Sequence, residues 1–271
     1  MKRIFILIIY ISLFVLLAAC TNEEGLDLGP KKEVSSYSSK VYKIEKNSTL
    51  KVDCDFGNIY VYCWDSDEIK FDVKRKIRGI GDKAKLEKKL SHFKINSDSS
   101  SNIISFSSKY EGKDKDAVDN SIDANIYVPR TMGDIYLKLD TGVIKINDNI
   151  KCNLKTEVNM ANVEVAGLEG NIQALAQMGN IRLNSGNILK ESNIKLGQGH
   201  INIKADFSDA GFGQMETSLG NIELQVERNS LVEFETVGDV EINEFKDAEA
   251  EDSTSKIKLS TSMGKISIRK Y

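Results

Sequence analysis

Apolar and polar residues alternate along most of the chain after residue 132, which is the pattern of a β-strand with one buried face. One phrase recurs there: a glycine or alanine, one residue that is usually polar, then two branched apolar residues separated by a polar one. The seven copies begin at Gly142, Ala161, Gly179, Gly199, Gly220, Gly238 and Gly264. Their spacings of 19, 18, 20, 21, 18 and 26 residues are typical of an array of repeated structural units.

This repeat predicts an elongated, all-β fold. A second alternating strand precedes most of the bends, as in Ile135 to Leu139 before Gly142, so each repeat provides two strands and a bend. Glycine supplies backbone angles that other residues resist, and a single repeat cannot bury its apolar face alone. We therefore expect residues 132–271 to form a single-stranded β-solenoid, similar to a parallel β-helix, with coils of about 18–21 residues.

The first nineteen residues have the pattern of an export signal. Lys2 and Arg3 precede an uncharged run, Ile4 to Leu17, that is shorter than the roughly twenty apolar residues of a membrane-spanning helix. The sequence Leu17-Ala18-Ala19-Cys20 that ends this run resembles the bacterial lipobox. This resemblance implies that residues 1–19 are removed and that lipidated Cys20 anchors the chain on the extracytoplasmic face of the cell membrane.

Two regions separate the anchor from the repeats. Residues 20–40 combine glycine, serine and charges of both signs without periodicity, so we expect a flexible tether. Residues 41–131 are expected to form an N-terminal β region with one short helix at 82–93, where Leu86, Leu90 and Phe93 share a face. This apolar face is typical of a core contact, and it can also cover the open end of a stack of repeats.

An acidic insertion, Glu244 to Lys256, accounts for the spacing of 26 residues. Its carboxylates are Asp247, Glu249, Glu251 and Asp252. Calcium binding is the alternative, but the spacing matches no known calcium loop, so we favour a solvated surface loop.

Polar residues three and five positions after each bend are predicted to point outward and to lie about 4.8 Å apart on successive strands. Lys145, Arg182 and Lys204 are the cationic residues that we select from these rows, and we call them the cationic strip. The strip is a candidate contact surface for an anionic polymer. A solvated face with weakly favourable cross-strand pairs is the simpler interpretation.

Cysteine and histidine give little support for a metal or redox centre. Cys54, Cys63 and Cys152 remain after Cys20, and an odd number of cysteines cannot form a complete disulfide framework. We favour buried thiols and leave a Cys54–Cys63 bridge open. The chain has two histidines, neither near a Cys-x-x-Cys pair, so we expect no metal and no cofactor.

Enzymatic activity and nucleic-acid binding are not expected either. Glu223 and Glu241 are the carboxylates predicted on neighbouring rows, as an acid and base pair would require, but no further catalytic group can be assigned to them. No Gly-x-Ser-x-Gly elbow and no phosphate-binding loop is present. The net charge is −3 and lysine and arginine form no stripe with aromatic neighbours, which argues against a nucleic-acid partner.

The segment Ala124-Asn125-Ile126-Tyr127-Val128-Pro129, followed by an alternating strand, Thr141-Gly142 and the later Gly-Asn-Ile phrases, resembles the putative-adhesin family of bacterial β-repeat proteins, a domain of unknown function. An earlier copy, Gly57-Asn58-Ile59-Tyr60-Val61, fits the same arrangement. The resemblance implies a β-solenoid exposed on the cell envelope and brings no catalytic residues.

These observations favour a non-catalytic envelope lipoprotein, either adhesin-like or a scaffold. Its partner would be a cell-wall polymer, a host surface or another envelope protein. A polysaccharide-active β-helix enzyme and an envelope-stress accessory that acts through a membrane partner are the alternatives.

Overall fold

The structure, a computed structural model, describes residues 30–112, 119–189, 191–245, 253 and 255–271. The predicted signal peptide and Cys20 lie outside the described residues. The same is true of the four carboxylates of the acidic insertion, Asp247, Glu249, Glu251 and Asp252.

One sheet of fifteen strands and a single helix make up the described chain. The elements are β1 (Lys32–Lys43), β2 (Thr49–Trp64), β3 (Glu68–Gly79), α2 (Lys83–Leu90), β4 (Phe93–Ser100), β5 (Ile103–Tyr110), β6 (Asp119–Pro129), β7 (Thr131–Met178), β8 (Ile181–Leu183), β9 (Gly186–Ile188), β10 (Ser192–Gln198), β11 (Ile201–Ala205), β12 (Phe212–Leu219), β13 (Ile222–Val226), β14 (Val232–Asn243) and β15 (Ser255–Lys270).

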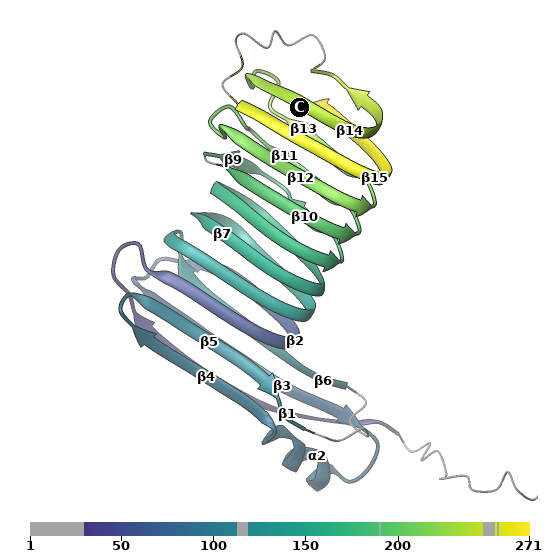
Figure 1. The fold of residues 1–271 in the computed structure, drawn as a ribbon. Helices are drawn as coiled ribbons and strands as arrows, with labels where there is room; N and C mark the ends of the chain where they lie inside the picture. The colour runs from purple at the N-terminus through teal and green to yellow at the C-terminus, as the bar shows by residue number, and fades with distance from the viewer. Residues whose placement is uncertain (1–29, 113–118, 190, 246–252, 254) are drawn as a thin grey trace, which may run out of the picture.

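The strands form two layers that meet at the glycine bends (Figure 1). Strand β2 shows the arrangement: its first half pairs with β5 and β7, and after the bend at Gly57 its second half pairs with β6 and β7. We call the layer of strands that lead into the bends the pre-bend layer, and the other the post-bend layer. Ile59, Ile144 and Ile222 are buried between the layers, which confirms the alternation expected from the sequence.

The prediction of a single-stranded β-solenoid is wrong, although the all-β part of it is correct. Strand β7 pairs with β10 in the pre-bend layer and with β8 in the post-bend layer, and β15 likewise pairs with both β12 and β13. The pairs β10–β12, β11–β13 and β11–β8 complete the ring, so seven parallel strands form a closed barrel. Closure arises because β7 and β15 continue through their bends and belong to both layers. Strands β1, β3 and β6 extend the sheet at one end and β14 at the other.

The last repeat does not follow chain order. Strand β15 lies between β13 and β14 in the post-bend layer and between β12 and β14 in the pre-bend layer. β14 therefore comes before β15 in the chain but lies at the outer edge of the sheet, with β15 between it and the earlier repeats. Register shifts at Val237/Asp239 and Val240/Ile242 accompany this arrangement.

The N-terminal part differs from expectation in one place. Residues 32–40, expected within the tether, belong to β1, which pairs antiparallel with β3 along its whole length. Val34 is buried in the core, and this contact orders a segment whose composition indicated a tether.

The predicted helix is present as α2, with Asp82 accepting a hydrogen bond from the Ala84 amide, but it is shorter than the predicted 82–93 because Phe93 begins strand β4. Leu86 is buried, and the helix packs against β1 and β3 at the N-terminal end of the sheet. Among the residues that the structure describes, no helix combines the length and apolar composition needed to cross a membrane.

Candidate functional site

The cationic strip is not a single row of positive charge. Lys145 and Arg182 lie in one row of the post-bend layer on either side of Glu164, and the Lys145 ammonium is 3.2 Å from that carboxylate. Lys204 lies in the next row, with its ammonium 4.3 Å from the centre of the Tyr271 ring. Lys145 is therefore partly neutralised, and the three cations act from separate points of the surface.

A cluster of aromatic side chains lies beside Lys145 on the outer side of the same layer. Tyr60, Tyr62 and Trp64 alternate along β2 with the inward-facing Ile59 and Val61, so their rings are directed outward. The neighbouring strand β6 contributes Tyr127. We call these four rings, Tyr60, Tyr62, Trp64 and Tyr127, the aromatic patch.

Three rings of this patch, Tyr62, Trp64 and Tyr127, are in contact, and a lysine lies at its margin. Tyr62 and Tyr127 are stacked with centroids 5.4 Å apart, and Trp64 is 5.8 Å from Tyr127. The Lys70 ammonium lies 4.6 Å from the centre of the Tyr127 ring, the geometry of a cation–π contact. Burial, followed by the neighbouring Tyr127 and Tyr60, raises the pKa of Tyr62, so its hydroxyl remains a hydrogen-bond donor. The patch thus combines apolar ring surface with polar tips.

A hollow of about 560 Å³ adjoins the patch on the side of β1. Tyr60 lines it together with Tyr37, and Asp72, Lys74, Asp123 and Asn125 supply its polar groups. The aromatic surface is therefore continuous with a charged depression that spans β1, β3 and β6.

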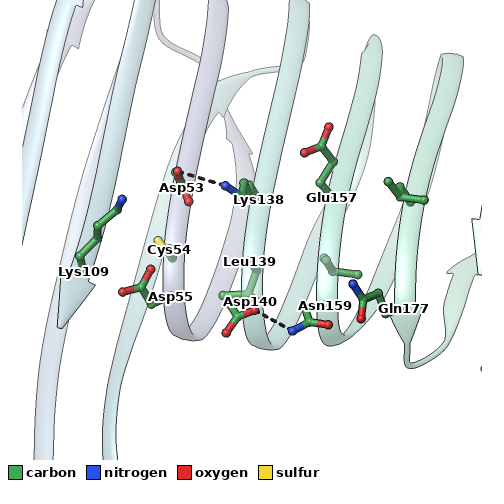
Figure 2. A pocket seen from close by; sticks show the side chains of 12 residues that line it. Asp53, Cys54, Asp55, Lys109, Lys138, Leu139, Asp140, Glu157, Asn159 and Gln177 are labelled. Carbon is green, nitrogen blue, oxygen red and sulfur yellow. Dashed lines mark hydrogen bonds and ion pairs between the residues drawn. The ribbon is translucent and has the colours of Figure 1, made fainter. Parts of the chain in front are cut away.

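The outer side of the pre-bend layer carries a different arrangement, shown in Figure 2. Four carboxylates, Asp53, Asp55, Asp140 and Glu157, and two ammonium groups, Lys109 and Lys138, line a shallow pocket of about 350 Å³. Asp53 lies 3.6 Å from Lys138, and Asp140 accepts a hydrogen bond of 2.9 Å from Asn159. These contacts join residues on neighbouring strands, as expected for cross-strand pairs on a solvated face.

Glu157 in this pocket is poorly suited to act as a general acid. It accepts a 2.6 Å hydrogen bond from the Tyr136 hydroxyl and lies 3.0 Å from the Lys155 ammonium, and these two contacts hold its carboxyl pKa below the usual value. A general acid at neutral pH needs a raised pKa. Burial and the bond to Glu157 raise the pKa of Tyr136 to about 12, so this hydroxyl is not a ready base either.

Glu223 and Glu241 are not neighbours, and the prediction that they occupy adjacent rows is wrong. Glu223 is paired with Ser267 of β15, and β15 separates it from β14, which carries Glu241. The Glu241 carboxylate lies 2.7 Å from Lys265, and this contact lowers its pKa. The two glutamates cannot share a proton in this arrangement.

Cys54, Cys63 and Cys152 are free thiols, with Cys54 and Cys152 buried and Cys63 half-buried. Burial raises the pKa of Cys63 to about 11 and that of Cys152 to about 12, and it raises the pKa of Cys54 further still. Since the thiolate is the reactive form, none of the three has the character of a nucleophile. Within the described ranges, no three His, Cys, Asp or Glu side chains are grouped as metal ligands would be.

The aromatic patch was not expected from the sequence. Its signal was present in the outward positions of Tyr60-Val61-Tyr62-Cys63-Trp64, where aromatic residues stand in place of the polar residues of later repeats. Tyr127 occupies the corresponding outward position of the strand that supported the family resemblance.

No protein-family model matches the chain, and no curated protein matches its sequence. Three similar solved structures are a putative adhesin from Bacteroides fragilis, a putative cell adhesion protein from Clostridium sporogenes and a putative lipid binding protein from Parabacteroides distasonis. The identities are 14%, 13% and 12%, with TM-scores of 0.46, 0.36 and 0.25. The matches cover 87%, 88% and 87% of this chain and 97%, 100% and 96% of the other chains. None of the three is named as an enzyme. At these levels of similarity, a function has to be argued from the surface of the chain itself.

Proposed function

We propose that the protein is a non-catalytic lipoprotein of the cell envelope, adhesin-like or a scaffold, that binds an anionic wall polymer through the outer side of its post-bend layer. The observation that carries the proposal is the aromatic patch, which lies on an open sheet surface between Lys70 and Lys145. Cell-wall polymers present sugar rings and anionic groups, and this surface has a partner for each.

The chemistry of the patch suits a sugar chain. A sugar ring has apolar C–H faces and hydroxyl groups at its edge, while tyrosine and tryptophan offer apolar rings with polar tips. The stacked Tyr62 and Tyr127 can therefore pack against ring faces, and Asn125 in the adjoining hollow can bond to hydroxyl groups. Lys70 and Lys145 are ion-paired with Asp72 at 2.7 Å and with Glu164 at 3.2 Å, so each adds a partly neutralised positive charge that can contact phosphate or carboxylate groups.

The sheet also suits a long ligand. The row that contains Tyr60 continues through Lys145, Glu164, Arg182 and Asn202, with one residue from each successive repeat about 4.8 Å from the last. A polymer that lies across the strands meets several of these residues at once. Each contact is weak, but together they raise the apparent affinity.

The anchor is the second part of the proposal. Its support is the sequence Leu17-Ala18-Ala19-Cys20 after a short apolar run. Two acyl chains on one cysteine would hold the protein stably, where a single chain gives only marginal binding. The non-catalytic assignment is supported by the ion-paired, low-pKa states of Glu157 and Glu241.

The experiment that tests polymer binding uses the unlipidated chain, Cys20→Ser, exported behind a conventional secretory signal peptide. Its binding to washed envelopes and to purified anionic wall polymer is measured at low and high salt. Tyr62→Ser with Tyr127→Ser should weaken binding about tenfold or more, as loss of an aromatic anchor does. Replacing Lys145, Arg182 and Lys204 with serine should weaken binding less and reduce its salt dependence.

The control is Leu175→Ser, an exposed apolar position on the opposite layer, which should leave binding unchanged. Thermal melting of each variant verifies that it is folded. Full binding by the tyrosine variant would remove the aromatic patch from the proposal. Release of polymer fragments that stops in Glu223→Gln or Glu241→Gln would show that the protein is an enzyme.

A further inference from the structure

Apolar residues lie along the edge where the two layers meet, and all of them except the half-buried Leu219 are exposed. The residue directly before the bend glycine, or before Ala161, is apolar in six of the units, and we call these residues the methionine edge: Phe56, Met160, Met178, Leu219, Val237 and Met263. Met178 and Leu219 both pair with Gln198, and Leu219 pairs with Met263, so these three members occupy one row across the strands. Val237 pairs with Ser260 and lies out of register with Met263. Figure 1 shows the bends stacked along one edge of the molecule.

The methionine edge is unusual because its methionine side chains are exposed, whereas other methionines of the chain are buried. Met160, Met178 and Met263 are 49%, 47% and 67% exposed, whereas Met132 and Met215 are 4% and 1% exposed in the core. Thr141 and Gln198 interrupt the row, but several large apolar side chains exposed along one edge of a protein mark an interaction surface. Methionine is flexible and polarisable, which suits a contact with a surface that has no fixed shape.

The chain enters the described structure at the same edge. Gly57 at the bend pairs with Ile122, Ile122 with Arg75, and Arg75 with Ser36. These four residues are therefore aligned across the strands β2, β6, β3 and β1, at the position of the bend. Strand β1 begins at Lys32, four residues before Ser36, and therefore starts beyond the bend. Nine residues separate Cys20 from Pro30, and the ten Cα–Cα steps between them span at most about 35 Å. A lipid on Cys20 would thus hold this edge close to the bilayer.

Positive charge is concentrated at the N-terminal end of the edge. Helix α2 connects Gly79 at the end of β3, beyond the level of the Gly57 bend, to Phe93 at the start of β4, so it crosses from one layer to the other there. In the described segments 31–36, 75–92 and 119–121, nine residues are Lys or Arg and four are Asp or Glu. Lys31, Lys76 and Lys83 form ion pairs with Asp119, Asp123 and Glu87, and these segments still hold five more cationic than anionic residues in a chain of net charge −3.

We propose that the methionine edge and the basic end around α2 dock the protein onto an anionic lipid bilayer surface. The inference rests on the lipid anchor of the proposed function, and it adds a surface that the anchor alone does not require. Apolar side chains enter the interface between headgroups and acyl chains, and lysine and arginine are attracted to anionic headgroups. This orientation keeps the aromatic patch, on the outer side of the post-bend layer, open to the envelope.

The test measures oxidation of individual methionines to sulfoxides by chloramine-T, followed by peptide mass spectrometry. The lipidated full chain is placed on vesicles of phosphatidylcholine with one third phosphatidylglycerol, and the unlipidated chain in solution is the reference. Leu175→Met supplies a control methionine at a position that is 54% exposed but lies on the outer side of the pre-bend layer. Oxidation at Met160, Met178 and Met263 should be at least threefold slower on vesicles, while the control methionine should react at an unchanged rate.

A second experiment measures membrane binding by the methionine edge in the absence of the lipid anchor. The unlipidated chain should float with the same vesicles, less with pure phosphatidylcholine vesicles or in 0.5 M salt. Replacing Met160, Met178 and Met263 with glutamine should reduce flotation at least fivefold. Glutamine is suitable because Gln198 occupies the same position in its own unit, and an unchanged melting temperature confirms the fold.

These arms distinguish the two proposals. If Cys20 carries no lipid but the unlipidated chain floats and the glutamine variant does not, the anchor fails and the docking edge stands. If the three edge methionines are oxidised equally fast on vesicles and in solution, and the unlipidated chain does not float, the docking edge is wrong whatever the state of Cys20.

Discussion

Gly179 and Gly199 stack at the bend so closely that a Cβ atom on Gly199 would overlap the carbonyl oxygen of Gly179. Gly199 also has a φ of +134°, a conformation that residues with a side chain rarely adopt. The same overlap recurs between Gly142 and Gly57 and between Gly220 and Gly199. The bends therefore need glycine for two separate reasons, backbone angle and close approach.

Substitution of a bend glycine should separate these two reasons. Gly81 has a similar φ of +123°, but a Cβ atom added there would meet nothing within 4 Å, so Gly81→Ala adds only backbone strain, about 1–2 kcal/mol of lost stability. Gly199→Ala should cost about 1–3 kcal/mol more, because a neighbouring strand must move. Urea unfolding of both variants measures the difference. Equal losses would mean that the stacked strands adjust freely to a methyl group.

Neighbouring positions on β13 should respond in opposite ways. Ile222 is fully buried between the layers, and Glu223 is exposed on the outer side. Ile222→Asp buries an unpaired carboxylate and should lower the free energy of unfolding by about 3–5 kcal/mol. Glu223→Ala should change it by less than about 0.5 kcal/mol. Similar melting shifts for the two variants would contradict the register of β13.

The Tyr136–Glu157 hydrogen bond should give a small dependence of stability on pH. The folded-state pKa of Glu157 is depressed, so its contribution is present above the unfolded pKa of about 4.3 and is lost as pH falls through the folded value. Tyr136→Phe removes the hydroxyl and should raise the Glu157 pKa in an NMR titration. Its loss of stability at pH 7 should be below about 1 kcal/mol, because the pair is partly solvated.

The control for this prediction is Glu157→Gln, which abolishes the titration. In that background Tyr136→Phe should have the same effect at pH 7 and at pH 3. A Glu157 pKa that does not move in Tyr136→Phe would show that Lys155, 3.0 Å away, accounts for the whole depression.

Local features of the fold could be predicted from the sequence because they depend on periodicity. The inward position of Ile222 and the outward position of Glu223 follow from alternation, and α2 follows from the spacing of Leu86 and Leu90 after the capping Asp82. Pairing between distant strands is set by three-dimensional packing, so the return of β15 between β13 and β14 has no local signal. Two predictions were wrong for this reason: that Glu241 lies in the row next to Glu223, and that the repeats form a single-stranded solenoid.

The candidate site was predictable only in part for a related reason. Alternation showed that Lys145 and Arg182 point outward, but not that Glu164 lies between them at 3.2 Å from Lys145. The aromatic patch requires β6, from residues 119–129, to lie beside the second half of β2, a pairing of residues far apart in the chain. Tyr62 and Tyr127 could therefore not be placed together from their positions in the sequence.

The anchor makes the most direct prediction about where the protein resides. If Cys20 is lipidated, Cys20→Ser should release the chain from the membrane fraction after a high-salt wash, or leave it as uncleaved precursor, because the acyl chains supply the lasting attachment. The salt wash is needed because lysine and arginine near α2 would hold part of the unlipidated chain on anionic lipid. Ser12→Cys in the Cys20→Ser background is a control, since a thiol elsewhere in the apolar run should not restore anchoring. Fractionation with detection of the processed form measures the outcome, and normal processing with unchanged retention of Cys20→Ser in high salt would show that another part of the chain holds the protein on the membrane.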